Sequence, residues 1–460
     1  SPKRCTQACS VRSSGRANSR GPAAAGGGGI MVGGGGEIRP PVLLNDASAG
    51  IRHSLKARVC YIGNLLPGDT TPGGMVLSRH FNNAAAVIDF DVVQPALCPA
   101  NAWSWCRRMG GMASKVGFRE VSEVIHSYVG GRWADPIIER IVKEKRYDAI
   151  LTVAHGDLAY AAARCAAKVG VALVALFHDW WPDIPCRGRG ARRREAKHFE
   201  VLQREAFECL AVSDAMAELL TQARTVKRLY PIPAGDDLIK HVEPIQARLK
   251  HRLLYAGNLA EYGPMLVELA KAVHKTPGMC FEMRGNADMM PADDKRRLKN
   301  EGVLLDYAAS DEYDRCLRGG DGFLIVMTFH PAMRRRMETS FPSKLTTFAK
   351  YGKPLIIWGP EYCSAVRWAR ETSAAIYVTA EDPSVVLETV ERVFKNSELR
   401  REMGFRARRA YETDFNPAVL QAMFEESLMR AAGETRRRRK GQRASRSDAA
   451  ECFSSHEPVK

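Results

Sequence analysis

The sequence predicts an α/β protein made of two doubly wound parallel sheets that follow one another along the chain. Short apolar strands alternate with helix-like segments, and a Pro/Gly-rich break near Tyr230 interrupts this alternation before a second series begins at residue 251. At 460 residues the chain also exceeds the size at which a single core usually stops growing. We therefore expect two Rossmann-like halves whose facing loops bound a cleft.

In the first half, order is expected to begin at residue 57, after a Gly-, Ser- and Arg-rich segment without periodicity. The strand "ARVCYIGN" leads to "PGGM", which indicates a Gly-Gly turn before a helix. A basic stretch from Arg187 to Arg204 precedes the last strand of this half. Further strands are predicted at 85–93, 147–154, 171–179 and 208–214, and helices at 133–145, 157–170 and 215–223.

The second half repeats the alternation and ends in one or two helices with a break at Pro417. Its strands are predicted at 252–258, 279–285, 302–308, 322–328, 353–359 and 374–380, with helices at 264–275 and 384–396 among those between them. The resulting division is a disordered tail at 1–56, a first domain at 57–235, a second domain at 236–405, returning helices at 406–432 and a disordered basic tail at 433–460.

The formal net charge of +16 is concentrated at the two ends of the chain. Residues 1–56 hold eight Lys and Arg against two acids, and residues 431–460 hold eight against four, so ten of these charges lie in the tails. Because the body is only mildly basic and has no recognised nucleic-acid-reading module, a nucleic-acid-binding protein driven by its tails is a rival hypothesis and not the leading one. Contact of the tails with an anionic membrane stays open.

The 12 cysteines form no C-x-x-C pair and no zinc-type cluster, so we expect no metal site and interpret them as small buried side chains in a reducing cytosol. No apolar run is long enough to span a bilayer, and glycines interrupt the only signal-like segment. We therefore expect a cytoplasmic protein, with a peripheral contact at the inner face of the membrane left open.

A helix predicted to begin at Ser343 and Lys344 is the first candidate ligand site. It follows the strand 322–328 and therefore starts at the carboxyl edge of the second sheet. Free N–H groups and the positive end of a helix dipole attract anions, so phosphate is the expected guest. A capped surface helix without a ligand is the alternative.

The stretch "SFPSKLTTFAKYGKPLI" resembles the donor-site segment "PSK-L-x-E-Y-x-A-x-G-x-P" of retaining GT-B glycosyltransferases of family 4. Further pieces occur in the family's order: "PGGM", "VAHGD", "LFHDWWP", "LAVSDAMAELL", "LYPIP" and "LLYAGNL". The resemblance covers residues 57 to about 430 and implies a GT-B architecture without a cofactor, in which a UDP- or GDP-linked sugar is the co-substrate.

The resemblance implies that the segment from Ser340 through Phe341, Pro342 and Ser343 to Lys344 lies against the donor nucleotide and its diphosphate. Thr347 stands where the family usually has a Glu that binds ribose hydroxyls, and a hydroxyl offers less acceptor capacity than a carboxylate. Glu338 is a candidate for the first Glu of the family's spaced pair.

Gly257 and Asn258 match the loop after the first strand of the donor half, but the Arg and Lys that many members carry there are absent. Positive charge for a leaving diphosphate is therefore expected from Lys344, from Arg284 or from the run Arg334–Arg336. A run of charges is also typical of a solvated loop.

Polar residues at strand ends of the first half complete the candidate site. His155 follows its strand, and the resemblance implies a His near this loop that touches the transferred sugar, although a buried His satisfied by the backbone fits the pattern as well. His178 and Asp179, together with Gly73 and Gly74, are expected on the acceptor side.

We therefore expect a glycosyltransferase that moves a sugar from a nucleotide-sugar to a glycan, lipid-linked or small-molecule acceptor, with retention at the anomeric carbon. The alternative is a catalytically inactive GT-B scaffold that binds a nucleotide or glycan, which Thr347 makes plausible. The sequence names neither the sugar nor the acceptor.

Overall fold

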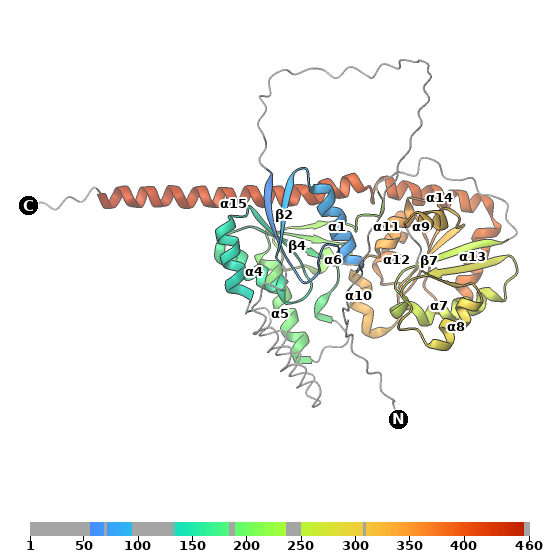
Figure 1. Cartoon of the computed structure of the whole chain (residues 1–460). Coiled ribbons are helices and arrows are strands. Elements are labelled where there is room, and N and C mark those ends of the chain that lie inside the picture. The colour runs from blue at the N-terminus through green and yellow to red at the C-terminus, as the bar shows by residue number, and fades with distance from the viewer. Residues whose placement is uncertain are drawn as a thin grey trace, which may run out of the picture. The chain divides into compact units, whose positions relative to one another are not determined.

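The computed structural model describes residues 56–68, 71–93, 132, 134–183, 189–235, 250–306 and 310–454, with side chains up to residue 442 (Figure 1). Two six-stranded sheets, both wholly parallel, form the framework, with strand orders β2-β1-β3-β4-β5-β6 and β12-β11-β10-β7-β8-β9. Helices flank both sheets, which confirms the predicted α/β class with two doubly wound halves.

The first sheet takes up the first half of the described chain. Its elements are β1 (Ala57–Ile62), α1 (Pro72–Ala84), β2 (Ile88–Val93), β3 (Ala149–Val153), α4 (Asp157–Val169), β4 (Leu173–Phe177), α5 (Arg189–Glu205), β5 (Glu208–Ala211), α6 (Asp214–Leu219) and β6 (Val226–Arg228), with a short 3-10 turn η2 (Trp181–Asp183) after β4. The strands lie where their apolar runs predict them. The edge strand β6 has only three residues and was not predicted, because such a short segment shows no period.

One feature of this half was not predicted, and a second differs from the sequence expectation. The basic stretch before β5 forms the helix α5, in which the buried Phe199 and Leu202 face the core. "PGGM" is not a turn, because Thr71 caps α1 by accepting a hydrogen bond from the Gly74 N–H at 3.2 Å, which places Gly73 and Gly74 in the first turn of the helix.

The second sheet comprises β7 (His251–Ala256), β8 (Met279–Arg284), β9 (Leu304–Leu305), β10 (Gly322–Val326), β11 (Leu355–Trp358) and β12 (Ile376–Val378). Its helices are α7 (Leu259–His274), α8 (Ala292–Asn300), α9 (Ser310–Arg318), α10 (Arg334–Thr339), α11 (Ser343–Ala349), α12 (Ser364–Thr372), α13 (Pro383–Lys395) and α14 (Ser397–Glu412), with a 3-10 turn η3 (Pro331–Met333). Five of the six strands fall within their predicted ranges, and β7 begins one residue before its predicted range of 252–258.

The last helix, α15 (Pro417–Ser454), runs back along the first half. Thr435 accepts a hydrogen bond from the Ala172 N–H at 2.8 Å, and Arg436 pairs with Asp148 at 2.9 Å. The segment expected to be disordered from residue 433 is therefore helical as far as residue 454, because contacts with the first sheet support it. The predicted tail at 1–56 lies outside the described residues except for Lys56.

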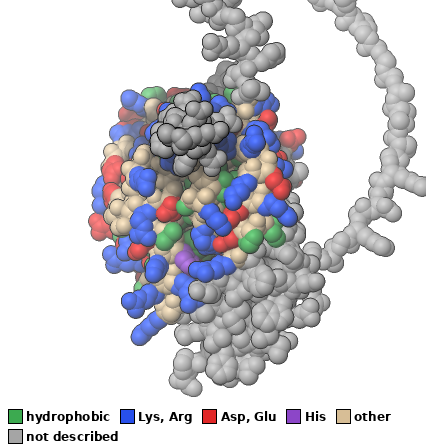
Figure 2. Space-filling view, turned by 90° about the vertical axis from the view of Figure 1, so that its left-hand side faces the viewer, with side chains coloured by type: hydrophobic (Ala, Val, Ile, Leu, Met, Phe, Trp, Pro, Cys, Tyr) green, Lys and Arg blue, Asp and Glu red, His purple; other side chains and the backbone are tan. Residues whose placement is uncertain are grey.

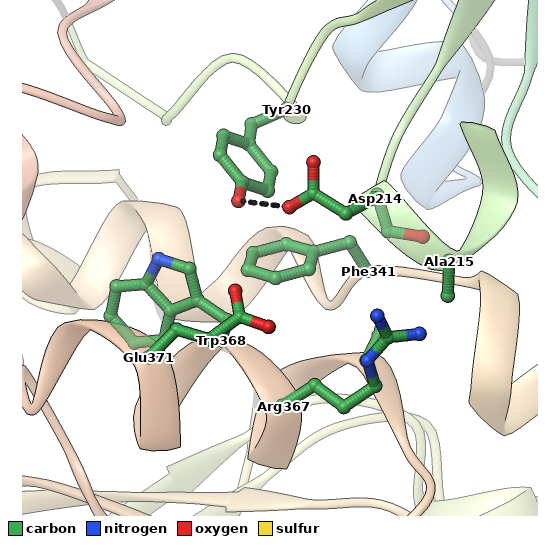
Figure 3. Close-up of a pocket in the computed structure, with 9 residues that line it drawn as sticks. Asp214, Ala215, Tyr230, Phe341, Arg367, Trp368 and Glu371 are labelled. Carbon is green, nitrogen blue, oxygen red and sulfur yellow. Dashed lines mark hydrogen bonds between the residues drawn. The ribbon is translucent and has the colours of Figure 1, made fainter. Parts of the chain in front are cut away.

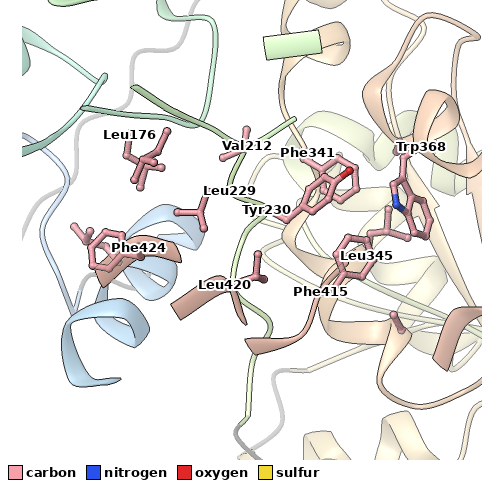
Figure 4. Close-up of a cluster of buried hydrophobic side chains, with 14 of the residues drawn as sticks. Leu176, Val212, Leu229, Tyr230, Phe341, Leu345, Trp368, Phe415, Leu420 and Phe424 are labelled. Atoms are coloured by element: carbon pink, nitrogen blue, oxygen red, sulfur yellow. The ribbon is translucent and has the colours of Figure 1, made fainter. Parts of the chain in front are cut away.

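A continuous apolar core joins the two halves. It contains Leu176 and Leu229 from the first half, Phe341 and Leu345 from the second, and Phe424 from α15 (Figure 4). Two further clusters fill the outer faces of the sheets. Because the strands are packed in these cores, their carboxyl ends have defined positions, and so do the loops that begin there.

Candidate functional site

Lys344, in the first turn of α11, is a half-buried cation at the carboxyl edge of the second sheet. Its Nζ donates to the Tyr313 hydroxyl at 3.3 Å and lies 5.4 Å from the centre of that ring. Burial, aided by the nearby charge of Arg79, lowers the pKa of Lys344 to about 8. Within the described parts of the chain no carboxylate forms an ion pair with this lysine, so an anionic ligand would relieve its electrostatic cost.

Arg79 approaches Lys344 from the other half of the molecule. It lies on α1, and its Nη1 donates to the Ile232 carbonyl at 3.0 Å in the segment that leaves the first sheet. The two like charges therefore come close together where the halves meet, an arrangement that favours the binding of an anion between them.

Arg284 is the last residue of β8 and lies near Tyr313. Burial raises the pKa of Tyr313, and the charge of Arg284 lowers it by a smaller amount. Its Nη1 donates to the Asp306 carbonyl, while its Nε is buried and has no hydrogen-bond partner among the described residues. Arg284 and Lys344, both predicted from the sequence, thus both lie near Tyr313. Arg79 and Tyr313 were not predicted, and no local sequence signal distinguishes them.

A second charged group connects the facing edges of the two sheets. Arg336 on α10 contacts Asp179, which follows β4, with 3.2 Å from Nε to Oδ1, and Glu261 on α7, with 3.0 Å from Nη1 to Oε1. Ser340 also donates to Asp179. Burial raises the pKa of Asp179, but the charge of Arg336 and the Ser340 hydrogen bond outweigh it and hold that pKa below its usual range.

The structure separates the members of the arginine run. Arg334 and Arg335 both bind Glu338, at 3.1 and 3.0 Å. Only Arg336 of these three reaches a carboxylate of the first half within hydrogen-bond distance, since the contact from Arg335 to Asp183 is 3.8 Å. Glu338, predicted to face the donor, is held by two arginines of its own helix.

The two histidines predicted at strand ends of the first half lie close to each other. The charge of His155 acts on His178, and burial lowers the pKa of His178 to about 4, so His178 is neutral at pH 7. His155 packs on Trp181, with ring centroids 3.8 Å apart. A Cβ added to Gly73 would lie 2.7 Å from the Leu65 side chain and 3.7 Å from His178 Nδ1, so α1 begins beside this pair.

Gly257 and Asn258 form the start of α7. Asn258 caps the helix by accepting from the N–H groups of Ala260 and Glu261, and its amide donates to Glu261 at 3.1 Å. The neighbouring loop packs tightly, because a Cβ on Gly285 would lie 2.1 Å from the Gly257 carbonyl oxygen.

Thr347 and Phe341 take part in internal contacts. The Thr347 hydroxyl accepts from the Ala234 N–H at 3.1 Å, in the segment that leaves the first half, and donates to the Ser343 carbonyl of its own helix at 3.0 Å. Phe341 is 7% exposed and packs against Tyr230, with centroids 4.6 Å apart. Neither side chain is open to a nucleotide here. Pro342 precedes α11 at its N-cap position.

The side chains around Phe341 leave a small pocket between α6 and α12 (Figure 3). Asp214, Tyr230, Arg367 and Trp368 are among the residues that line it. Its free volume of about 10 Å³ is roughly the space of one water molecule, so it cannot hold a nucleotide.

In the described part of the chain, no group of three or more His, Cys, Asp or Glu could hold a metal ion. No helix among the same residues is long and apolar enough to cross a membrane. On the face shown in Figure 2, Lys and Arg side chains are interspersed with acidic ones and do not form one stripe. The expected absence of a nucleic-acid partner and the membrane contact both stay predictions.

Neither a known protein-family model nor a curated protein matches the sequence. Solved structures match the fold. A trehalose-6-phosphate synthase shares 11% identity at a TM-score of 0.57, covering 81% of this chain and 99% of its own. The Anabaena protein HepE in complex with UDP-glucose shares 12% at 0.55, covering 81% and 99%. Sucrose-phosphate synthase from Thermosynechococcus elongatus shares 11% at 0.55, covering 81% and 98%. These similarities show a GT-B fold.

Proposed function

We propose that this protein is a hexosyltransferase that transfers a sugar from a UDP- or GDP-linked donor to a glycan, lipid-linked or small-molecule acceptor, with retention at the anomeric carbon. The observation that carries the proposal is Lys344, a half-buried cation without a carboxylate partner among the described residues, which faces Arg79 across the meeting edges of two GT-B sheets. A diphosphate supplies the negative charge that this arrangement needs.

In this reaction the bond between the anomeric carbon and the phosphate oxygen breaks, and its electron pair leaves with the nucleoside diphosphate. The acceptor hydroxyl forms the new bond to the anomeric carbon and gives up its proton, which the departing phosphate oxygen can accept. Lys344 and Arg284 would stabilise the charge that develops on the diphosphate. Because His178 is neutral at pH 7, it and His155 would serve as hydrogen-bonding groups toward the sugar.

The fold supports the same assignment, because ligands of doubly wound sheets bind outside the carboxyl ends of the strands. The candidate residues that follow β3, β4 and β7 or end β8 lie at those ends. HepE, which shares the fold, was solved with UDP-glucose. Closure about the predicted hinge at 231–250 would complete the site, although residues 236–249 lie outside the described part.

The first experiment is thermal stabilisation of the protein by UDP, GDP, ADP, CMP and dTDP, each with and without EDTA. We expect one nucleotide, UDP or GDP, to raise the melting temperature and to do so equally in EDTA. A shift that disappears in EDTA would overturn metal-independent binding, and the absence of any shift would overturn the proposed donor class.

Lys344→Ala then tests the residue. Turnover with the identified donor should fall about 10²- to 10³-fold, because one charge that stabilises the transition state is lost. Lys271→Ala is the matched control, since Lys271 is an exposed lysine of α7 that pairs with Glu268. Near-normal turnover of Lys344→Ala would contradict the assignment, provided that circular dichroism shows an intact fold.

A further inference from the structure

The contacts of Arg336 place two carboxylates and one guanidinium at the facing edges of the sheets. Arg336 occupies one oxygen of Asp179 and one of Glu261. The second oxygen of Glu261 accepts from Asn258. The second oxygen of Asp179, Oδ2, has no hydrogen-bond partner within the described residues. An accessible carboxylate oxygen that a buried network orients can accept hydrogen bonds from a ligand.

The charge of this group, which we call the carboxylate cluster (Asp179, Glu261 and Arg336), is negative by one unit when both acids are ionised. The neighbouring His178 does not offset this charge, because burial keeps it neutral at pH 7. The cluster therefore differs in sign from the cationic group of Lys344, Arg79 and Arg284.

A short stretch of chain connects the two groups. Ser340 donates to Asp179, and Lys344 follows only four residues later, a separation that an extended chain spans in at most about 14 Å. A sugar attached to a diphosphate beside Lys344 would therefore lie within reach of the carboxylate cluster. Sugar hydroxyls are donors that a carboxylate oxygen accepts well, whereas a sugar carboxylate would be repelled by both Asp179 and Glu261.

We propose that the carboxylate cluster selects a neutral, hydroxyl-bearing sugar on the donor and rejects a uronic acid, with Asp179 as the specificity-determining residue. This inference rests on the proposed function. It assigns Asp179 to the transferred sugar, although the sequence had placed that residue on the acceptor side.

The test compares matched donors on the full chain by isothermal titration calorimetry. The probes are UDP with UDP-glucose and UDP-glucuronate, and GDP with GDP-mannose and GDP-mannuronate. For the nucleotide that binds, we expect the neutral sugar donor to bind at least about tenfold more tightly than the uronate donor.

Asp179→Asn removes the charge and keeps the shape, so the ratio of the two affinities should fall about tenfold toward one. Because both donors carry the same nucleoside diphosphate, the ratio of their affinities cancels any effect of the substitution on diphosphate binding. Asp183→Asn is the matched control: this aspartate lies in the same loop, approaches Arg335 at 3.8 Å and should leave the ratio unchanged. If Asp179→Asn fails to fold, Glu261→Gln provides the same test from the second half.

The outcomes separate the two proposals. If UDP or GDP binds in a Lys344-dependent way but both sugars bind equally, or if neither Asp179→Asn nor Glu261→Gln changes the ratio, the selectivity inference is overturned and the donor class stands. If neither nucleotide binds, both proposals are overturned.

Discussion

At the scale of the residue, Lys344 is held in the ligand-free protein at an energetic cost. Its neighbours are the Tyr313 ring and Arg79, and burial lowers its pKa to about 8 from the ordinary value of 10.5. A site that binds an anion requires this kind of destabilised cation, because the charge must be uncompensated before the ligand arrives.

We expect Lys344→Met to raise the free energy of unfolding of the ligand-free protein at pH 7 by about 1 kcal/mol. Below pH 8 the lysine is protonated in both states, so its burial costs the folded state fully. Between pH 8 and 10.5 the folded protein loses this proton before the unfolded chain does, so wild-type stability rises relative to the variant and the advantage of Met shrinks.

Urea unfolding of both proteins at pH 7 and pH 10 checks this sign. A Met variant that is less stable at pH 7, or whose advantage grows with pH, would show that Lys344 is not strained. The same variant should also lose the thermal shift that the donor nucleotide causes.

At the scale of the element, two glycines distinguish a helix that packs closely against neighbouring backbone from one that does not. A Cβ on Gly404 of α14 would lie 2.3 Å from the Gly352 carbonyl oxygen, and backbone cannot move aside cheaply. Gly433 of α15 has open space around the same position.

We expect Gly404→Ala to destabilise the protein by about 2 kcal/mol, because α14 must shift away from the end of α11. Gly433→Ala should stabilise it by about 0.5–1 kcal/mol, since alanine is the better helix former. Chemical denaturation of the two variants gives both values. Equal effects of the two substitutions would contradict the tight α14 contact.

At the scale of the whole molecule, one apolar core passes through both halves and the start of α15. Phe415, fully buried between α14 and α15, lies 5.2 Å from Tyr230 of the first half and 5.1 Å from Trp368 of the second, measured between ring centroids. Unfolding one half therefore exposes apolar surface of the other, which couples their stabilities.

Phe415→Ala should lower stability by about 3–5 kcal/mol and shift a single calorimetric transition to lower temperature. Phe405→Ala, at a side chain that is 68% exposed, should change stability by less than about 0.5 kcal/mol. Two separate transitions, of which Phe415→Ala moves only one, would show that the halves unfold independently.

The sequence by itself determined the fold class and the edge at which the candidate residues lie. Alternating apolar strands and amphipathic helices predict parallel sheets, and parallel strands place all their carboxyl ends on one side. The positions of Lys344, Arg284, His155 and His178 at this edge were predicted in this way, since each follows or ends a strand. The helix from residue 433 and the position of Gly73 in a helix were missed, because long-range contacts and a capping threonine decide them.

Only the tertiary structure decided which charges meet. Arg334, Arg335 and Arg336 are indistinguishable in sequence, yet only Arg336 joins Asp179 and Glu261, and Asp179 lies 157 positions away in the chain. Arg79 approaches Lys344 and Thr347 binds the segment between the halves for the same reason. Electrostatic energy depends on distance in space, and packing of the two sheets sets that distance independently of separation along the chain.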